Sequence, residues 1–158
     1  MNKALADELF EYRDGALYWR STRGTAKAGN QAGTVRKDGR RDICIDGKKY
    51  LDYLIIFLMH HGYMPDCIDH IDNDVSNNRI ENLRPATIAQ NAHNSKCRIN
   101  SKSGVKGVFW HKATNKWSVS LWVKRVRKYI GLFDTIEEAT KAATQARNQH
   151  HGEYANHG

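Results

Sequence analysis

The stretch CIDHIDNDVSNNRIENLRPAT, residues 67–87, is polar in its middle and apolar at both ends. Ile68 and Ile71 precede the polar part, and Ile80 and Leu83 follow it. CIDHI alternates as a short strand does, and DNDVSNN has the composition of a loop. NLRPAT returns to extended structure, because the residue before a proline disfavours helix. The pattern predicts two short strands that are anchored in a core and joined by a polar loop.

The residue types in this stretch are those that phosphodiester hydrolysis requires, because water must lose a proton and the phosphate charge must be neutralised. Asp69 and His70 are neighbours on the predicted strand, so their side chains diverge. Asp69 can hold a divalent cation through a hard oxygen ligand, while His70 faces the attacking water as its base. The alternative is that the two residues merely close a turn.

A short helix is predicted directly after the second strand. Thr87 and Gln90 have the spacing of a capping box, which places Asn91 on this helix. Asn91 can supply a second oxygen ligand to the cation, and Asn82 can hydrogen-bond the loop and keep His70 aimed. Strand, loop, strand and helix would then converge on one site of the size of a phosphate group.

The charge of the chain favours a polyanionic partner. Its 158 residues carry a formal net charge of +8 at pH 7, and the pI is about 9.5. Nucleic acid and anionic membranes are the usual partners of such proteins. No apolar run has the length of a membrane span, and the N-terminus lacks a signal-peptide pattern, so no membrane partner is predicted. The three cysteines lack C-x-x-C spacing, which favours buried thiols in a reducing cytoplasm over disulfides or zinc.

The part of the chain before residue 67 has the pattern of a small β-rich module. A short helix is predicted over ALADELFEYR, residues 4–13, and Asp-Gly pairs indicate turns between strands. A second helix is predicted over about 51–61, where Gly62 provides a C-cap.

Basic residues recur after Ser95, and from Lys96 to Lys128 there is no Asp or Glu. GVKGVFW, KWSVSLWV and RKYIGLF read as strands, and a final helix is predicted from Thr135, which forms a capping box with Glu138. The apolar face of the middle strand can bury against the alanine-rich face of this helix. The other face, with cations, hydroxyls and a tryptophan, suits the major groove of DNA. The alternative is a solvated basic surface without a specific partner.

The spacing of Asp69, His70, Asn82 and Asn91 resembles that of the phage-type HNH (ββα-metal) endonucleases, in the variant whose last histidine is asparagine. DGALYWR, DGKKYLDYLIIFLMHHGYMP and IDHIDNDVSNNRIENLRPATIAQNAHN extend the resemblance over residues 1–95. It implies His70 as the general base, Asp69 and Asn91 as metal ligands, and Asn82 as the middle catalytic residue with a mainly structural role. It also implies Mg2+, or another divalent cation such as Mn2+, as the cofactor.

The ββα-metal motif would occupy about residues 67–95 of this nuclease unit. Two positions depart from the family pattern. Tyr53 and Leu54 stand where many relatives have His-Arg, and Asn73 stands where the loop often carries Gly. Asparagine tolerates the left-handed backbone conformation that glycine adopts in such loops.

The sequence GVKGVFWHKATNKWSVSLWVKRVRKYIGLFDTIEEATKAATQAR, residues 104–147, resembles the APETALA2-type DNA-binding domain of plant transcription factors and phage endonucleases. The resemblance implies a domain over residues 96–158, with a three-stranded antiparallel sheet packed on one helix. Its implied DNA-facing positions are Lys106, Phe109, His111, Ser120, Trp122, Arg127 and Tyr129.

Together these features predict an α+β protein with a small β-rich N-terminal module, a ββα-metal motif and a C-terminal sheet-and-helix domain. The predicted function is hydrolysis of phosphodiester bonds in double-stranded DNA by a phage homing or nicking enzyme. We expect a monomer or weak dimer in the cytoplasm of the infected host cell. The alternatives are a non-catalytic DNA-binding regulator, whose nuclease half is inert, and an RNA-binding module.

Overall fold

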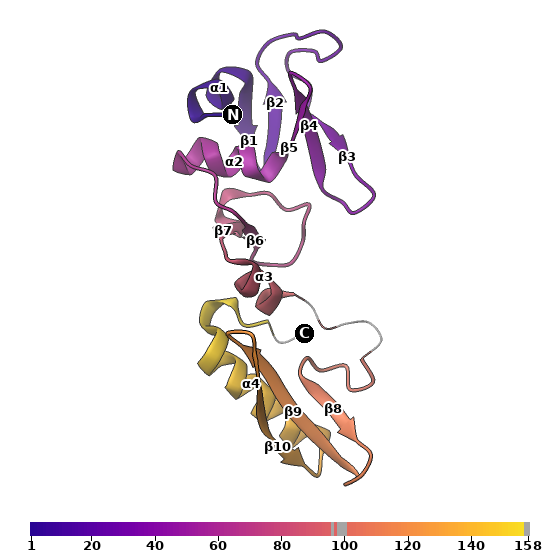
Figure 1. Cartoon of the computed structure of the whole chain (residues 1–158). Helices are drawn as coiled ribbons and strands as arrows, with labels where there is room; N and C mark the ends of the chain where they lie inside the picture. The colour runs from indigo at the N-terminus through magenta and orange to yellow at the C-terminus, as the bar shows by residue number, and fades with distance from the viewer. Residues whose placement is uncertain (96, 98–100, 157–158) are drawn as a thin grey trace. The chain divides into compact units, whose positions relative to one another are not determined.

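The computed structural model describes residues 1–95, 97 and 101–156. Helices and strands are mixed along this part of the chain, which confirms the predicted α+β class (Figure 1). No helix among the described residues has the length and apolar character that crossing a bilayer would need. The cysteines are exposed or partly exposed, so the prediction of three buried thiols is wrong.

Contacts divide the chain into two compact units, Met1–Thr87 and Ile88–Gly158. The sequence pattern instead places the domain boundary after Ser95. That boundary adjoins Lys96, which, like Arg98 of the acid-free basic run, lies outside the described residues.

The first unit begins with a helix and a hairpin, continues with a small sheet, and ends with a second helix and two short paired strands. Its elements are α1 (Lys3–Leu9), β1 (Phe10–Arg13), β2 (Ala16–Trp19), β3 (Thr34–Val35), β4 (Arg41–Ile45), β5 (Lys48–Leu51), α2 (Asp52–His61), β6 (Ile68–His70), η1 (Ile80–Asn82) and β7 (Leu83–Pro85). All strand pairs are antiparallel: β1 with β2, β4 with β3 and β5, and β6 with β7. The first helix is shorter than predicted, because Phe10–Arg13 pairs with β2 instead of extending α1.

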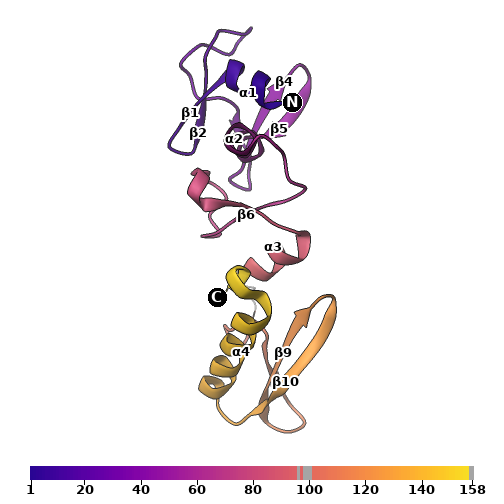
Figure 2. The ribbon, with the colours of Figure 1, turned by 90° about the vertical axis from the view of Figure 1, so that its left-hand side faces the viewer.

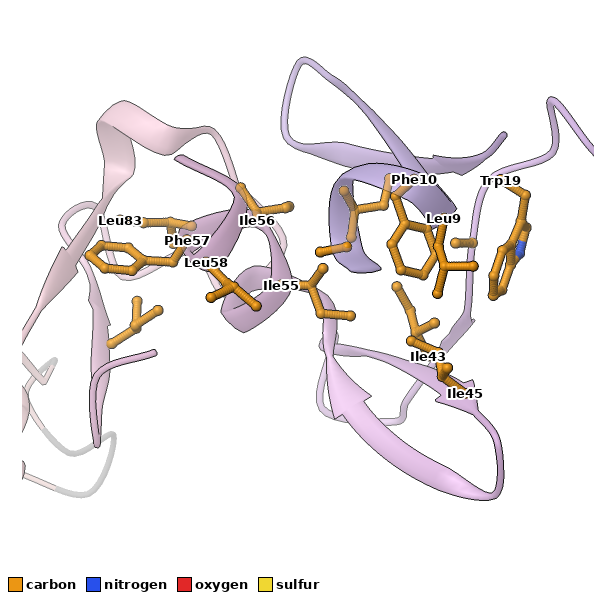
Figure 3. Packing of buried hydrophobic residues seen from close by; sticks show 14 residues of the cluster. Leu9, Phe10, Trp19, Ile43, Ile45, Ile55, Ile56, Phe57, Leu58 and Leu83 are labelled. Atoms are coloured by element: carbon orange, nitrogen blue, oxygen red, sulfur yellow. The ribbon is translucent and has the colours of Figure 1, made fainter. Parts of the chain in front are cut away.

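One hydrophobic core holds the first unit together. Ile55 and Phe57 of α2 are fully buried and pack with side chains from α1, β1, β2 and β4 (Figure 3). Leu83 of β7 lies beside Phe57 in this view, and Ile68 of β6 belongs to the same cluster, so both strands are anchored as predicted. Ile71 differs from the prediction, because the strand has ended before it and its side chain is 45% exposed.

The second unit consists of a short helix, a three-stranded antiparallel sheet and a longer helix that packs on the sheet. Its elements are α3 (Ile88–Asn94), β8 (Val108–His111), β9 (Lys116–Val123), β10 (Val126–Phe133), α4 (Ile136–His151) and η2 (Gly152–Tyr154). The strand order is β10–β9–β8, and α4 runs along the sheet (Figure 2). Val108 and Val119 pack against alanines of α4. At the start of α4, the backbone N–H of Glu138 donates to Thr135 Oγ1 at 3.2 Å, in the predicted capping box.

Candidate active site and nucleic-acid interface

Asp69 and His70 are the last two residues of β6, and both side chains are buried. The β6–β7 register places Arg84 directly opposite Asp69. Arg84 donates to Asp69 Oδ2 from both Nε, at 2.8 Å, and Nη2, at 2.7 Å. A carboxylate that is 2% exposed needs such a partner, because an unpaired buried charge is strongly destabilising. Arg84 is not among the residues that the motif predicts. Its role as the partner of Asp69 follows from the cross-strand register.

The imidazole of His70 is held by a side chain of the polar loop. His70 Nε2 lies 2.8 Å from Asn78 Oδ1, and Asn78 Nδ2 donates to Asp52 Oδ2 at 2.9 Å. The backbone N–H of Tyr53 donates to the other oxygen, Asp52 Oδ1, at 2.8 Å. Burial raises the pKa of Asp52 to about 6, against these hydrogen bonds, which lower it. Neither Asn78 nor Asp52 belongs to the motif. An acid in the first turn of a helix, such as Asp52, interacts favourably with the helix dipole, so its presence there does not by itself indicate a functional site.

The first turn of α2 also contacts the ring of His70. The ring of Tyr53 meets it edge to face, with centroids 5.2 Å apart and planes at 81°. Burial raises the pKa of the Tyr53 hydroxyl. Tyr53 is one of the two residues that replace His-Arg of many relatives, so this departure from the family pattern lies against the predicted general base.

Asn82 closes the polar loop through hydrogen bonds to Asp72 and Asn77. Its Oδ1 accepts from the backbone N–H of Asp72 at 3.0 Å, and its Nδ2 donates to Asp72 Oδ1 at 2.9 Å and to the carbonyl of Asn77 at 2.7 Å. Asn73, inside the same loop, has a φ of 61°. It therefore adopts the left-handed conformation expected at a position where relatives carry glycine.

The β1–β2 hairpin supports the segment that carries Asn78. Its turn contains Gly15, with a φ of +87°, and a Cβ there would lie 2.9 Å from the backbone nitrogen of Arg79 and 3.0 Å from the carbonyl carbon of Asn78. Tyr12 of β1 accepts a hydrogen bond from the backbone N–H of Ile80 at 3.2 Å, through its hydroxyl oxygen. The close approach that glycine permits thus fixes the backbone beneath Asn78.

Asn91, the second predicted metal ligand, lies on α3 in the second unit. Asp69 and Asn91 therefore belong to different compact units. Among the residues that the structure describes, no three or more His, Cys, Asp and Glu side chains gather into a group that could hold a metal ion.

The sheet register brings most of the predicted DNA-facing residues onto one face of the second unit. Trp122 pairs with Arg127, and Ser120 pairs with Tyr129. The side chain of Trp122 is 61% exposed and that of Tyr129 is 60% exposed. The guanidinium of Arg127 lies 5.8 Å from the ring centroid of Phe109, which is itself 52% exposed.

Three of the predicted residues have partners that the alternation of the strands does not reveal. Ser120 is only 5% exposed, and its hydroxyl accepts a hydrogen bond from Arg127 Nε at 3.0 Å. Lys106 precedes β8, and its Nζ donates to the carbonyls of His93 and Ser95, at 2.8 and 2.6 Å, near the end of α3. Burial lowers the pKa of Lys106. His111 Nδ1 lies 2.8 Å from the hydroxyl of Thr114, across the β8–β9 turn.

Models of two known protein families match the two parts of the chain. A family model described as HNH endonuclease matches residues 54–93, and one described as AP2 domain matches residues 103–153. Protein 3.8 of Escherichia phage T7 is 30% identical over 88 residues, which cover 56% of this chain and 72% of the relative. The chain belongs to the HNH endonuclease family and carries an AP2 domain. No solved structure matches it at a significant level.

The two matches occur in the order that the motifs predict. The HNH match contains His70, Asn82 and Asn91, and it begins just after Asp52 and Tyr53, the residues of α2 that support His70. The AP2 match contains the three-stranded sheet and the whole of α4.

Proposed function

We propose that this HNH protein is a metal-dependent endonuclease that hydrolyses phosphodiester bonds in double-stranded DNA. The observation that carries the proposal is the pair at the end of β6, where His70 is oriented by Asn78 and Asp69 is held by Arg84. Two adjacent polar side chains that are buried and held separately are arranged for chemistry rather than for closing a turn.

In the proposed mechanism His70 accepts the proton of the attacking water. A positioned base of this kind contributes about 10²- to 10⁴-fold to the rate. Arg84 keeps the Asp69 carboxylate in place and balances its charge before DNA binds. Asn82 holds the polar loop closed, and Asn78 of that loop holds the imidazole.

The donor chemistry of the two predicted ligands fits a hard divalent cation such as Mg2+ or Mn2+. Asp69 offers a carboxylate and Asn91 an amide oxygen, and Mg2+ ordinarily takes few protein ligands and completes its shell with water and substrate phosphate. A cation bound there would neutralise phosphate charge and stabilise the leaving oxygen. The residues 1–95 would thus supply the chemistry.

Residues 96–158 would supply most of the affinity for DNA. Phe109, Trp122, Arg127 and Tyr129 form an exposed face of aromatic rings and a cation, and strands of this size can enter the major groove. Ser120 would act by orienting Arg127. Lys106 would act by holding the end of α3, and His111 by ordering the β8–β9 turn.

One HNH site handles one strand at a time, so a monomer would nick DNA. The resemblance to a protein of phage T7 supports a phage origin, with action in the cytoplasm of the infected host cell, as a homing or nicking enzyme. A DNA-binding regulator without catalysis remains the second candidate function, supported by the AP2 match alone.

The decisive experiment incubates supercoiled plasmid with the full-length protein, with and without Mg2+. We expect nicked circles only with the metal. His70→Ala should lower the cleavage rate about 10²- to 10⁴-fold and leave DNA binding nearly intact, while His61→Ala, at the exposed end of α2, should cut normally. A His70→Ala protein that cuts at the wild-type rate would refute the mechanism, and binding without cleavage by the wild type would favour the regulator.

A further inference from the structure

A buried chain of three polar side chains ends on the imidazole of His70. Asp52 begins α2, Asn78 lies in the polar loop, and His70 ends β6, so the three come from separate segments of the first unit. Asp52 and Asn78 are each only 4% exposed, and His70 is 7% exposed. The donor–acceptor distances are 2.9 Å from Asn78 Nδ2 to Asp52 Oδ2 and 2.8 Å between Asn78 Oδ1 and His70 Nε2.

The chemistry of the three groups fixes which group donates and which accepts in each of the two hydrogen bonds. An ionised carboxylate can only accept hydrogen bonds, so the amide of Asn78 must turn its NH2 group toward Asp52. Its oxygen then faces His70, and an amide oxygen also only accepts. The proton of that hydrogen bond therefore belongs to Nε2 of the imidazole. In a neutral imidazole one nitrogen carries the proton, which leaves the lone pair on Nδ1.

The surroundings hold the chain in this geometry. The backbone N–H of Tyr53 binds the second oxygen of Asp52, and the ring of Tyr53 packs edge to face with that of His70. The hairpin turn at Gly15 presses against the backbone of Asn78 and Arg79. A rotation of the Asn78 amide would point its oxygen at the Asp52 carboxylate, which leaves one buried contact repulsive whichever nitrogen of His70 carries the proton.

We propose that Asp52 is a positioning residue that acts through Asn78 to hold His70 as the Nε2–H tautomer, so that Nδ1 is the atom that accepts the proton of water. The assignment of the tautomer stands on the three side chains alone. The role of Nδ1 in catalysis rests on the proposed nuclease function.

The test compares full-length wild type with Asp52→Asn and with the exchanged pair Asp52→Asn/Asn78→Asp. Asp52→Asn keeps the shape of the side chain, but its oxygen keeps the hydrogen bond from the Tyr53 N–H and its NH2 group then faces Asn78. The Asn78 amide is then favoured in the turned orientation, which points its NH2 at His70. The exchanged pair restores the direction, because Asn at 52 donates to a carboxylate at 78, which accepts from His70 Nε2–H. The control is Asp46→Asn, which removes an exposed charge in a turn where Asn fits the φ of 48°.

Long-range proton–nitrogen spectra of the 15N-labelled, metal-free proteins report the tautomer of His70, whose signals are identified by their absence in His70→Ala. At about pH 8 an ordinary histidine is neutral. We expect a single Nε2–H form in the wild type, the control and the exchanged pair, and a shift to the Nδ1–H form, complete or as a mixture, in Asp52→Asn. An Nδ1–H form in the wild type, or an unmixed Nε2–H form in Asp52→Asn, would overturn the proposal.

Plasmid nicking by the same proteins tests the positioning role of Asp52 separately from the proposed nuclease activity. We expect Asp52→Asn to lower kcat about 10- to 100-fold, as loss of an outer hydrogen-bonding partner typically does, with KM unchanged and with recovery in the exchanged pair. Tautomers that behave as stated in a protein that cuts no DNA would support the positioning role and overturn only the nuclease function. Cleavage by the wild type with no loss in Asp52→Asn would overturn the positioning role alone.

Discussion

Asp52 shows how a single buried group can oppose stability while it serves a site. Burial raises the pKa of its carboxyl to about 6 from the ordinary value of 3.8. The folded state therefore binds the proton more tightly than the unfolded state does. The contribution of this group to stability is fully present below about pH 4 and is lost as the pH rises through about 6.

We expect this loss to disappear in Asp52→Asn, which carries no titratable group at that position. A shift of about two pKa units corresponds to about 3 kcal/mol. Between about pH 4 and pH 7, the unfolding free energy of the wild type should fall by about that amount relative to the variant. Urea unfolding of both proteins at several pH values measures the difference. Parallel pH profiles would contradict the burial of an ionised Asp52.

Trp122 and Lys124 are close in sequence but differ in what they present to DNA. Trp122 is 61% exposed on the sheet face that also carries Arg127, while Lys124 lies in the β9–β10 turn with a φ of 49°. We expect Trp122→Ala to change the preference among DNA sequences. Lys124→Gln should weaken binding to all sequences alike, because a phosphate contact carries no sequence information. Competition binding on a panel of duplexes distinguishes the two, and identical profiles would contradict the groove-facing role of Trp122.

At the scale of elements, the β1–β2 hairpin acts on a loop far from it in sequence. Its turn, Asp14-Gly15, has positive φ angles of 45° and 87°, and the β4–β5 turn, Asp46-Gly47, has 48° and 77°. The turns are alike, but only Gly15 approaches another backbone, that of Asn78 and Arg79. Nothing lies within 4 Å of a Cβ at Gly47.

This pair of turns allows a matched comparison. Alanine at either glycine costs backbone strain, of order 1–3 kcal/mol. We expect Gly15→Ala to cost about 1–3 kcal/mol more than Gly47→Ala, because the added methyl group overpacks against the loop. It should also slow cleavage, since it displaces Asn78. Urea unfolding and plasmid nicking measure both effects. Equal costs for the two variants would show that the hairpin does not support the loop.

At the scale of the whole molecule, the excess positive charge belongs to one unit. Residues 1–87 contain 13 Lys and Arg and 13 Asp and Glu, while residues 88–158 contain 12 and 4. The net charge of +8 therefore arises entirely after Thr87. Counterion release from DNA should follow the same distribution, because each neutralised phosphate adds about −0.9 to the slope of log affinity against log salt.

We expect a slope of about −4 to −5 for the intact protein, which corresponds to about five phosphate contacts. Neutralising exposed cations of the second unit to Gln, at Lys112, Lys124, Arg125 and Lys128, should make the slope shallower. The matched control neutralises Arg23, Lys27, Lys37 and Lys48 of the first unit and should leave the slope nearly unchanged. Binding measured at several salt concentrations decides the question. An equal loss of slope in both variants would place DNA contacts on the first unit as well.

The sequence by itself determined the features that depend on neighbouring residues. The 67–87 stretch forms two anchored strands around a polar loop, and α2 ends at Gly62, with a φ of 80°, as the C-cap predicts. The Thr135 capping box and the three strands of the second unit likewise follow from local spacing and alternation. Each of these patterns lies within one element or one turn, so periodicity and capping chemistry suffice to read it.

Only the tertiary structure decided which side chains hold the site. Asp52 and His70 meet through Asn78 because α2 and β6 pack into one core, and no local pattern encodes that packing. Ser120 lies on the expected face of its strand, yet it is buried with its hydroxyl bonded to Arg127 of the neighbouring strand. Alternation fixes the face of a side chain, whereas its exposure and its partners depend on what the rest of the chain packs against it.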